Sequence, residues 1–218
     1  MSTILCIETA STNCSVAIGV NGKLLALKED YDSSYSHAER LHNFIKEILE
    51  ENDLKLSNLD AIAVSKGPGS YTGLRIGVSA AKGLCFSLDL PLISVPTLSS
   101  LAYQVENEGT IIPMMDARRM EVYTAVFNKE KEQIGETSAK ILDAGSYKEY
   151  LDEQVVYFIG SGVEKFQKIC EHPNARYIEN VLPSAVQMVA LATIKYKKSD
   201  FEDVAYFEPY YLKDFMAG

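Results

Sequence analysis

The sequence carries the same short pattern twice, about half a chain apart. In the first copy an apolar run, Ile4–Ile7, ends in Glu8 and leads through a turn into a second apolar run at Ser15–Ile18. In the second copy Ile111–Met115 ends in Asp116 and again leads through a short turn into an alternating run. A layout that recurs at half the chain length indicates an internal duplication. We therefore expect two related lobes, each begun by two strands with an acidic residue at the end of the first.

The order of elements within the lobes predicts an α/β protein. Asn21-Gly22 is a two-residue hairpin turn between apolar runs, so the first lobe opens with a β-hairpin. Strand and helix signals then alternate in β-α-β-α order, which predicts a mixed sheet with packed helices. We expect an N-terminal lobe over residues 1–108, which would hold a partner interface, and a reduced C-terminal lobe over residues 109–218.

The composition is that of an ordinary globular protein, with 47% hydrophobic and 23% charged residues. No apolar stretch is long enough to span a membrane and no basic leader opens the chain, so we expect a cytoplasmic protein without a membrane partner. Four cysteines occur without a CxxC pair, which predicts reduced and buried thiols. They are Cys6, Cys14, Cys85 and Cys170.

The formal net charge of −9 makes the chain by itself a poor nucleic-acid binder, because it repels phosphate backbones. Two local basic pairs, Arg118-Arg119 and Lys197-Lys198, are more typical of solvated surface than of a binding site. Whether Arg118 and Arg119 have a binding role stays open at this point.

The stretch Ser65–Gly77 holds four glycines and a proline between a predicted strand and a predicted helix at Tyr71–Leu88. Such a turn can hold a phosphate, because free N–H groups and the helix dipole point at it. A Walker loop would need lysine after its last glycine, but Leu74-Arg75 follows Gly73. The glycine spacing also differs from the dinucleotide-binding fingerprint. These departures favour a use other than phosphate binding.

The predicted helix at Tyr71–Leu88 has more apolar surface than a sheet can cover. Its one distinct stripe, about 60° wide, is formed by Arg75, Ser79, Lys82 and Phe86. The remaining apolar arc spans roughly 220°, whereas a helix on a sheet buries about 100°. Two explanations stay open: a neighbouring helix of the same chain, such as the one that begins at Ser36, or another protein.

Catalytic arrangements are mostly absent from the sequence. His37 and His42 are five residues apart, so a helix would point them in different directions and they could not share a metal ion. His172 lies in a loop, and three unlinked histidines make neither a triad nor a metal site. Glu8 and Asp116 at their strand ends could hold a metal-bound phosphate or simply cap the turns that follow. We assign no catalytic and no metal-binding residue.

Three segments of the chain resemble the TsaB (YeaZ) family. They are ILCIETAS at Ile4–Ser11, GPGSYTGLRIG at Gly67–Gly77 and PMMDAR at Pro113–Arg118. The resemblance runs over nearly the whole chain and is strongest up to residue 127. It implies the two-lobed actin-like ATPase (ASKHA) fold, in agreement with the duplication. It also implies a role in making N6-threonylcarbamoyladenosine (t6A) in tRNA, at the adenosine beside the anticodon.

The resemblance implies a scaffold subunit that is not itself catalytic. Its partners would be a TsaD-like transferase and a TsaE-like ATPase, with tRNA reached only through the complex and a homodimer formed when the chain is alone. The family's metal site is a TsaD HxxxH pair, whose spacing His37 and His42 do not match. We expect no intrinsic cofactor, and whether ATP or ADP binds at the junction with partner subunits stays open. The candidates, should a nucleotide bind, are Glu8, Thr9, Asp116, Gly160 and Gly162.

By the same resemblance, the helices at Ser36–Asn52 and Tyr71–Leu88 would contact the TsaD-like partner. The predicted interface residues on these helices are Leu41, Phe44, Ile45, Ile48, Leu74, Arg75, Val78, Ala81, Lys82 and Cys85.

Two rival functions remain. The first is a stand-alone actin-like ATPase or kinase, motivated by Glu8, Asp116 and Gly160–Gly162. Against it, Glu8 stands where that fold's first phosphate loop has aspartate, and Thr9-Ala10 follow where glycine would be expected. The second rival is a peptidase, for which the sequence offers no site.

Overall fold

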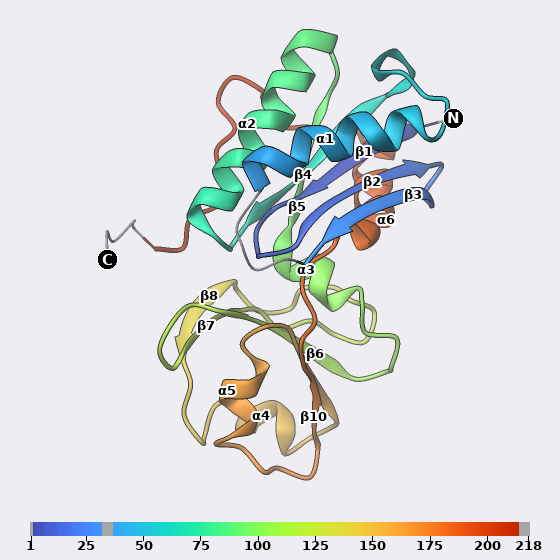
Figure 1. Cartoon of the computed structure of the whole chain (residues 1–218). Helices are drawn as coiled ribbons and strands as arrows, with labels where there is room; N and C mark the ends of the chain where they lie inside the picture. The colour runs from blue at the N-terminus through green and yellow to red at the C-terminus, as the bar shows by residue number, and fades with distance from the viewer. Residues whose placement is uncertain (1, 32–36, 214–218) are drawn as a thin grey trace. The chain divides into compact units, whose positions relative to one another are not determined.

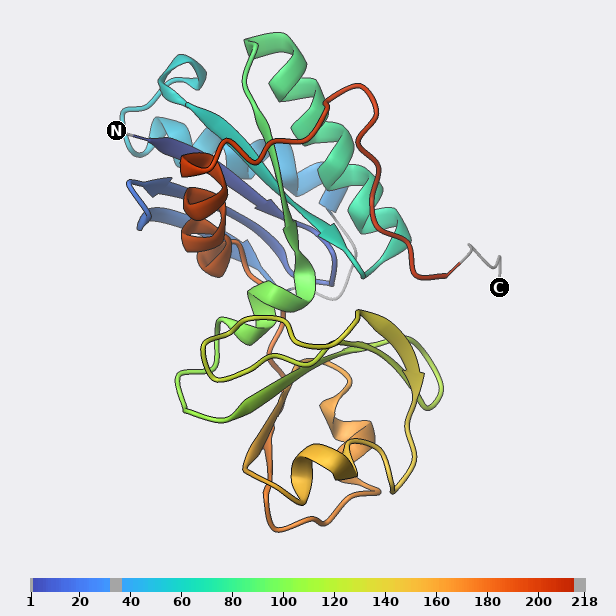
Figure 2. The same ribbon diagram turned by 180° about the vertical axis from the view of Figure 1, so that it is seen from behind.

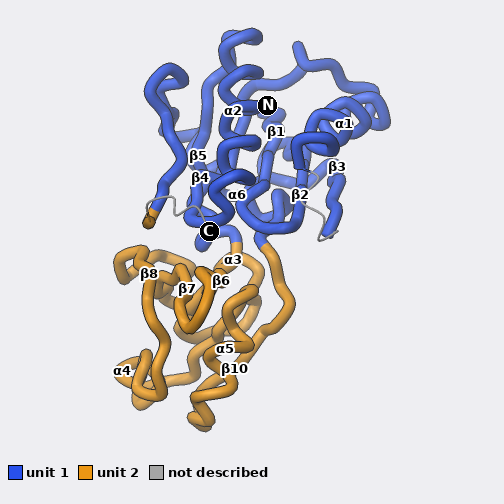
Figure 3. The backbone as a smooth tube through the Cα atoms, turned by 60° about the vertical axis from the view of Figure 1, so that its left-hand side comes forward, with its two compact units in different colours: residues 1–100, 183–211 blue, residues 101–182, 212–218 orange. Residues whose placement is uncertain are grey.

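The computed structural model describes residues 2–31 and 37–213, which form two compact units (Figure 3). Unit 1 comprises Met1–Ser100 and Pro183–Tyr211, and unit 2 comprises Leu101–Leu182 and Leu212–Gly218. The sequence predicts one continuous cut, after residue 108. The units are discontinuous instead, because the chain returns to unit 1 after residue 182.

Unit 1 is built on a five-stranded mixed sheet in the order β3-β2-β1-β4-β5. Its strands are β1 (Thr3–Glu8), β2 (Cys14–Val20), β3 (Lys23–Asp30), β4 (Ala61–Gly67) and β5 (Leu92–Pro96). β1 pairs antiparallel with β2 and parallel with β4. The predicted hairpin turn joins β2 to β3, and both turn residues, Asn21 and Gly22, have the positive φ angles, 52° and 83°, that such a turn requires.

Helices cover both faces of this sheet (Figures 1 and 2). On one face lie α1 (His37–Glu50) and α2 (Tyr71–Leu88), and on the other lies α6 (Ala185–Lys197). Because strand side chains alternate, Leu5 and Ile7 of β1 enter the core under α1 and α2, whereas Ile4 and Cys6 pack under α6. Coverage on both faces explains why β1 is apolar at nearly every position.

Unit 2 repeats the topology of unit 1, because its sheet has the order β10-β9-β6-β7-β8. Its strands are β6 (Thr110–Asp116), β7 (Glu121–Thr124), β8 (Ser138–Ile141), β9 (Val156–Ile159) and β10 (Ala175–Ile178). Read from its other edge, this sheet matches the first strand for strand. The expected duplication is therefore confirmed at the level of topology.

The helices of unit 2 are short, as the prediction of a reduced second lobe implies. α4 (Lys148–Leu151) and α5 (Val163–Gln167) are single turns, compared with the 14 and 18 residues of α1 and α2. Aromatic rings fill the core beneath them. Phe158 and Phe166 meet edge to face with ring centroids 4.8 Å apart, and Tyr147 closes the cluster at 5.6 Å from Phe166. Two connecting helical segments are η1 (Leu56–Asn58) and α3 (Thr97–Ala102).

Serine side chains cap the N-termini of α2 and α6. The Ser70 side chain caps α2 by accepting a hydrogen bond from the Gly73 amide at 3.3 Å. The Ser184 side chain caps α6 by accepting a hydrogen bond from the Val186 amide at 3.1 Å. The expected helix start at Ser36 lies outside the described residues.

All four cysteines are free and buried, as predicted. Burial raises the pKa of the Cys6 thiol to about 12, so this thiol stays protonated at neutral pH. Within residues 2–31 and 37–213, no helix is long and apolar enough to cross a bilayer.

Candidate functional site

The loop that follows β1 is stabilised by its own acidic residue. Glu8 is fully buried, and its Oε1 accepts hydrogen bonds from the Ala10 amide at 2.7 Å and the Ser65 hydroxyl at 2.8 Å. Its second oxygen has no partner within the described part of the chain. Burial raises the pKa of Glu8 to about 7, and the bonds from Ala10 and Ser65 only partly oppose that shift.

This loop packs directly on the first turns of α2, with its oxygen atoms facing the helix. The Thr9 hydroxyl donates to the Gly73 carbonyl at 2.8 Å, and the Ser70 amide donates to the Ala10 carbonyl at 2.7 Å. A Cβ placed on Gly73 would lie 2.1 Å from the Thr9 carbonyl oxygen, and one on Gly77 would lie 2.2 Å from Thr9 Oγ1. The glycines at 73 and 77 are therefore needed for close packing of helix on loop.

The same contacts show whether this loop could bind the phosphates of a nucleotide. A phosphate cradle needs free N–H groups. Here the Ala10 amide is bonded to Glu8, the Ser70 amide to Ala10, and the Gly73 amide to the Ser70 side chain. A buried carboxyl and two carbonyl oxygens would moreover face the anion. The first loop of unit 1, including Glu8 and Thr9, does not fit a phosphate.

The matching acid of unit 2 is in a different environment. Asp116 is exposed at the end of β6, and its Oδ1 accepts bonds from Lys165 Nζ at 2.8 Å and from the Arg118 amide at 2.6 Å. The Ser161 hydroxyl accepts a bond from the Asp116 amide at 3.1 Å. The carboxylate is thus engaged by an ion pair and a turn, and its role toward a nucleotide stays a prediction.

The glycines that flank Ser161 serve the packing of unit 2. A Cβ on Gly160, whose φ is 121°, would lie 2.5 Å from the Met114 carbonyl oxygen. One on Gly162 would lie 2.6 Å from a methyl carbon of Val122. Both glycines let the turn approach β6 and β7 closely, so their presence needs no ligand to explain it.

Two arginines are displayed at the tip of the β6–β7 connection. Arg118 and Arg119 are exposed, and both have left-handed backbone conformations, with φ angles of 71° and 49°. The turn is closed by a hydrogen bond from the Ala117 amide to the Glu121 carbonyl at 3.0 Å. Contact of these arginines with tRNA stays an open question.

The histidines are placed separately. His37 is buried at the start of α1 with Nε2 2.7 Å from the Ser11 carbonyl oxygen, and His42 is exposed farther along α1. Among the residues that the structure describes, no group of three or more histidine, cysteine or acidic side chains is arranged to hold a metal ion.

The predicted interface residues lie on one face of the unit 1 sheet but differ in exposure. Seven of them have side chains buried in the unit's own core: Leu41, Ile45, Ile48, Leu74, Val78, Ala81 and Cys85. Phe44 and Lys82 are half-buried, and Arg75 is exposed. The buried seven position the two helices and present little surface. That this face binds a partner stays a prediction.

Part of the surplus apolar surface of α2 is covered within the chain. Ile76, Ala80 and Leu84 are half-buried against the core cluster that includes α1. On the opposite flank, the segment of residues 203–211 lies along α2 (Figure 2), with Phe207 in the core. Residues 203–211 therefore pack back on the body of unit 1.

What remains uncovered is a stripe that we call the outer face of α2. Its exposed members are Thr72, Arg75, Ser79, Gly83 and Phe86. Phe86 is 86% exposed, and a Cβ built on Gly83 would meet no atom within 4 Å. The sequence analysis placed Phe86 on the same stripe as Arg75 but included neither Phe86 nor Gly83 among the predicted interface residues. A signal was available, since a glycine in a helix and an aromatic ring three residues later on a polar stripe have no use in the core.

Comparison with known proteins places the chain among relatives of similar length. Residues 31–217 match the family model described as TsaD, tRNA N6-adenosine threonylcarbamoyltransferase. The chain is 29% identical to the tRNA threonylcarbamoyladenosine biosynthesis protein TsaB of Haemophilus influenzae, over 97% of this chain and 94% of that protein. It is also 29% identical to TsaB of Escherichia coli, over 98% of this chain and 96% of that protein.

Two solved structures share the fold. YeaZ from Pseudomonas aeruginosa is 28% identical with a TM-score of 0.85, over 97% of this chain and 100% of that one. An uncharacterized protein with similarity to peptidase YEAZ, also from P. aeruginosa, is 27% identical with a TM-score of 0.87, over 98% and 100%. The predicted fold class, a two-lobed actin-like α/β protein, is confirmed.

Proposed function

Because the chain is a TsaB/YeaZ homologue and belongs to the family whose model is described as TsaD, tRNA N6-adenosine threonylcarbamoyltransferase, we propose that it serves t6A synthesis as a non-catalytic subunit. In this role it binds and activates a TsaD-like transferase, together with a TsaE-like ATPase. The names of its relatives, tRNA threonylcarbamoyladenosine biosynthesis proteins, support the pathway. The protein–protein role rests on the surface of α2.

The observation that carries the docking role is the pair Gly83 and Phe86 on the outer face of α2. Glycine in a helix costs about 1 kcal/mol relative to alanine. At Gly83 no intramolecular contact requires this cost, since a Cβ there would stand in open space. A helix from another protein that crosses α2 closely would require it, and the exposed Phe86 ring would add an aromatic anchor of the kind that dominates interfaces.

The non-catalytic part of the proposal is supported by the loop after β1. Glu8 is bonded to the Ala10 amide, and the Ser70 and Gly73 amides are also engaged, so these groups of the loop offer no donors to a phosphate. The same observation argues against a stand-alone ATPase or kinase. A nucleotide, if one takes part, would bind where the partner supplies the donors, and tRNA would be reached through the assembled complex.

The test is binding of the full-length chain to a purified TsaD-like transferase, followed by t6A formation on tRNA. Phe86→Asp and Gly83→Leu change only exposed positions, so both variants should fold, and both should weaken binding and lower t6A yield. Ile141→Asp is the matched control, because Ile141 is also an exposed apolar residue, at 72%, but lies in unit 2. The proposal is wrong if the transferase works at its full rate without this chain, or if neither α2 variant alters binding.

A further inference from the structure

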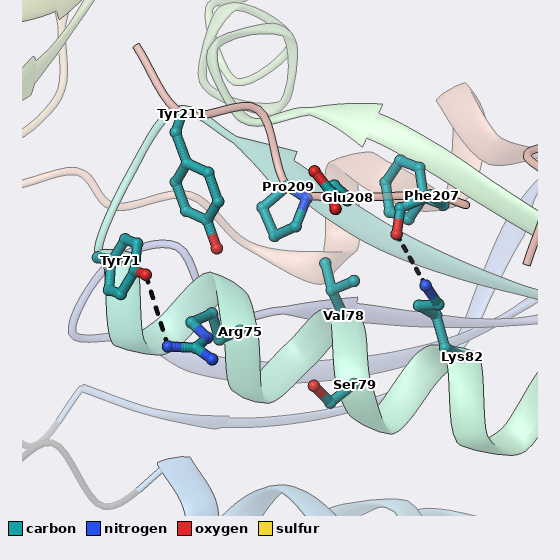
Figure 4. Close-up of a pocket in the computed structure, with 9 residues that line it drawn as sticks. All are labelled: Tyr71, Arg75, Val78, Ser79, Lys82, Phe207, Glu208, Pro209 and Tyr211. Atoms are coloured by element: carbon teal, nitrogen blue, oxygen red, sulfur yellow. Dashed lines mark hydrogen bonds between the residues drawn. The ribbon is translucent and has the colours of Figure 1, made fainter. Parts of the chain in front are cut away.

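A pocket of about 440 Å³ lies between α2 and the segment of residues 203–211, which we call the C-terminal strap (Figure 4). Both walls belong to unit 1. The lining residues from α2 are Tyr71, Arg75, Val78, Ser79 and Lys82, and those from the strap are Phe207, Glu208, Pro209 and Tyr211.

The strap is held on α2 and on β4 at several points, so the pocket is formed in advance. Lys82 Nζ donates to the carbonyl oxygens of Ala205 at 3.2 Å and Phe207 at 2.9 Å. The Tyr210 amide donates to the Lys66 carbonyl at 2.7 Å. At the far end the rings of Tyr71 and Tyr211 pack with centroids 4.9 Å apart. A preformed cavity avoids the cost of ordering its walls when a ligand enters.

The charges around this pocket are unusual for so acidic a chain. Arg75 is exposed and contacts Tyr71, with a guanidinium nitrogen 3.5 Å from the phenol oxygen and the group 5.4 Å above the ring. Within the described residues, neither Arg75 nor Lys82 forms an ion pair with a carboxylate, although the chain has 30 acidic and 21 basic residues. Glu208 is the one acidic lining residue. Lys82 is occupied by the strap carbonyls, so Arg75 is the cationic group of this pocket that can meet a ligand from outside the chain.

We propose that this pocket receives an acidic side chain, aspartate or glutamate, from a surface helix of the TsaD-like partner. This inference rests on the proposed function and adds the chemistry by which the partner is recognised. The planar guanidinium of Arg75 fits a carboxylate through two parallel hydrogen bonds. Val78, Pro209 and Tyr211 supply apolar surface for the methylene groups of that side chain, and the Ser79 hydroxyl is a further donor.

A single carboxylate suits this pocket better than a phosphate of RNA. A nucleic acid is a polyanion, so Glu208 and the chain's net charge of −9 oppose its approach more strongly than that of one carboxylate side chain. The pocket also shares Arg75 with the outer face of α2, so a helix that crosses Gly83 and Phe86 can place an acidic residue in it.

The experiment measures the dissociation constant of the full-length chain and the TsaD-like transferase over a series of salt concentrations. Arg75→Gln removes the guanidinium at an exposed site and should weaken binding about ten-fold while flattening the salt dependence. Arg75→Lys keeps the positive charge without the planar guanidinium, so its affinity should lie between that of the unaltered chain and that of Arg75→Gln. Lys197→Gln removes one exposed charge from α6, on the other face of the sheet, and should leave binding unchanged.

A charge-reversal arm identifies the partner residue. Arg75→Glu should abolish binding, and one member of a set of single Asp→Arg and Glu→Arg replacements on the partner's surface helices should restore it. Failure of the whole set to restore binding would count against a carboxylate ligand. If Arg75→Gln instead reduces binding of the isolated chain to tRNA and leaves binding to the transferase unchanged, the ligand is RNA and the inference is overturned.

The outcomes distinguish a failure of this inference from a failure of the proposed function. If Arg75→Gln binds the transferase with wild-type affinity and salt dependence while Phe86→Asp does not bind, the pocket proposal falls and the docking role stands. If the unaltered chain does not bind the transferase at all, both fall.

Discussion

The ammonium group of Lys82, in α2, donates a hydrogen bond of 2.9 Å to the carbonyl oxygen of Phe207 in the C-terminal strap. A second bond from the same group reaches the Ala205 carbonyl at 3.2 Å. The Phe207 ring is meanwhile buried in the core that α2 shares with the sheet. A residue near the end of the chain is thus fixed to the helix that we propose as the docking element.

Lys82→Met should loosen this strap. Methionine retains the apolar stem but leaves two carbonyls without their charged donor, and a hydrogen bond to a charged group is worth about 1.5 to 3 kcal/mol when well shielded. Because Lys82 is only half-buried, we expect a loss of about 1 kcal/mol in urea unfolding and faster amide hydrogen exchange over residues 205–211. Lys46→Met is the control, since Lys46 is exposed and faces only Glu50 at 3.9 Å. Unchanged exchange in the strap would show that its other contacts, such as the buried Phe207 ring and the bond from Tyr210 to Lys66, hold it without Lys82.

Substitution by alanine should change the stability of the chain in opposite directions at two glycines of α2, Gly77 and Gly83. At Gly77 a Cβ would meet Thr9 Oγ1 at 2.2 Å, so Gly77→Ala must displace the loop after β1 and should cost about 1 to 3 kcal/mol, as overpacking does. At Gly83 a Cβ meets nothing within 4 Å, so Gly83→Ala should stabilise the chain by up to about 1 kcal/mol. Thermal unfolding of the two variants beside the unaltered chain checks both signs. A destabilised Gly83→Ala variant would remove the argument that this glycine serves a partner.

These two glycines also show where sequence reasoning stops. The hairpin at Asn21-Gly22 and the extent of α2 follow from local patterns, and the structure agrees with both. Local patterns do not say which residue makes a glycine necessary, because that depends on what sits across from it in the fold: Thr9 for Gly77 and open space for Gly83.

The predicted interface residues lie on two sides of the same helices, and the sequence does not separate those sides. Amphipathic spacing identifies an apolar stripe, on which Leu41 and Val78 lie, but does not say what covers it. The stripe faces the chain's own sheet, so those side chains are buried, at 0% and 4% exposure. The assignment of residues 183–211 to unit 1 was not predicted from the sequence either. It depends on contacts between residues far apart in the chain, such as that between Lys82 and Phe207.

The aromatic cluster of unit 2 should carry much of that unit's stability. Phe166 is fully buried and contacts Phe158 and Tyr147 with ring centroids 4.8 and 5.6 Å away. Phe166→Ala would leave a cavity that its two neighbours cannot fill, at a cost of about 3 to 5 kcal/mol. Hydrogen exchange should report the loss in β6 and β9, which share this core. Phe201→Ala provides the comparison, because Phe201 is 40% exposed and should cost far less.

The buried carboxyl of Glu8 should make the stability of the chain depend on pH. Its pKa is raised to about 7 in the folded state, mainly by burial, from an ordinary value of 4.5. The folded chain therefore holds this proton more tightly than the unfolded chain, so the free energy of unfolding is highest below pH 4.5 as far as this group is concerned. It falls as the pH rises from about 4.5 to 7 and levels off above that. A shift of this size corresponds to roughly 3 kcal/mol at most.

Glu8→Gln isolates this contribution. The amide oxygen can accept the same bonds from Ala10 and Ser65 but cannot ionise, so the variant should lose the decline in stability between pH 5 and 8. At pH 8 it should be more stable than the unaltered chain, and at pH 4.5 the two should be close. Urea unfolding at a series of pH values measures the difference, with Glu50→Gln on the exposed side of α1 as the control. Parallel pH profiles for the Glu8 variant and the unaltered chain would mean that the pKa of Glu8 in the folded chain stays near its ordinary value, and the predicted pH dependence would be wrong.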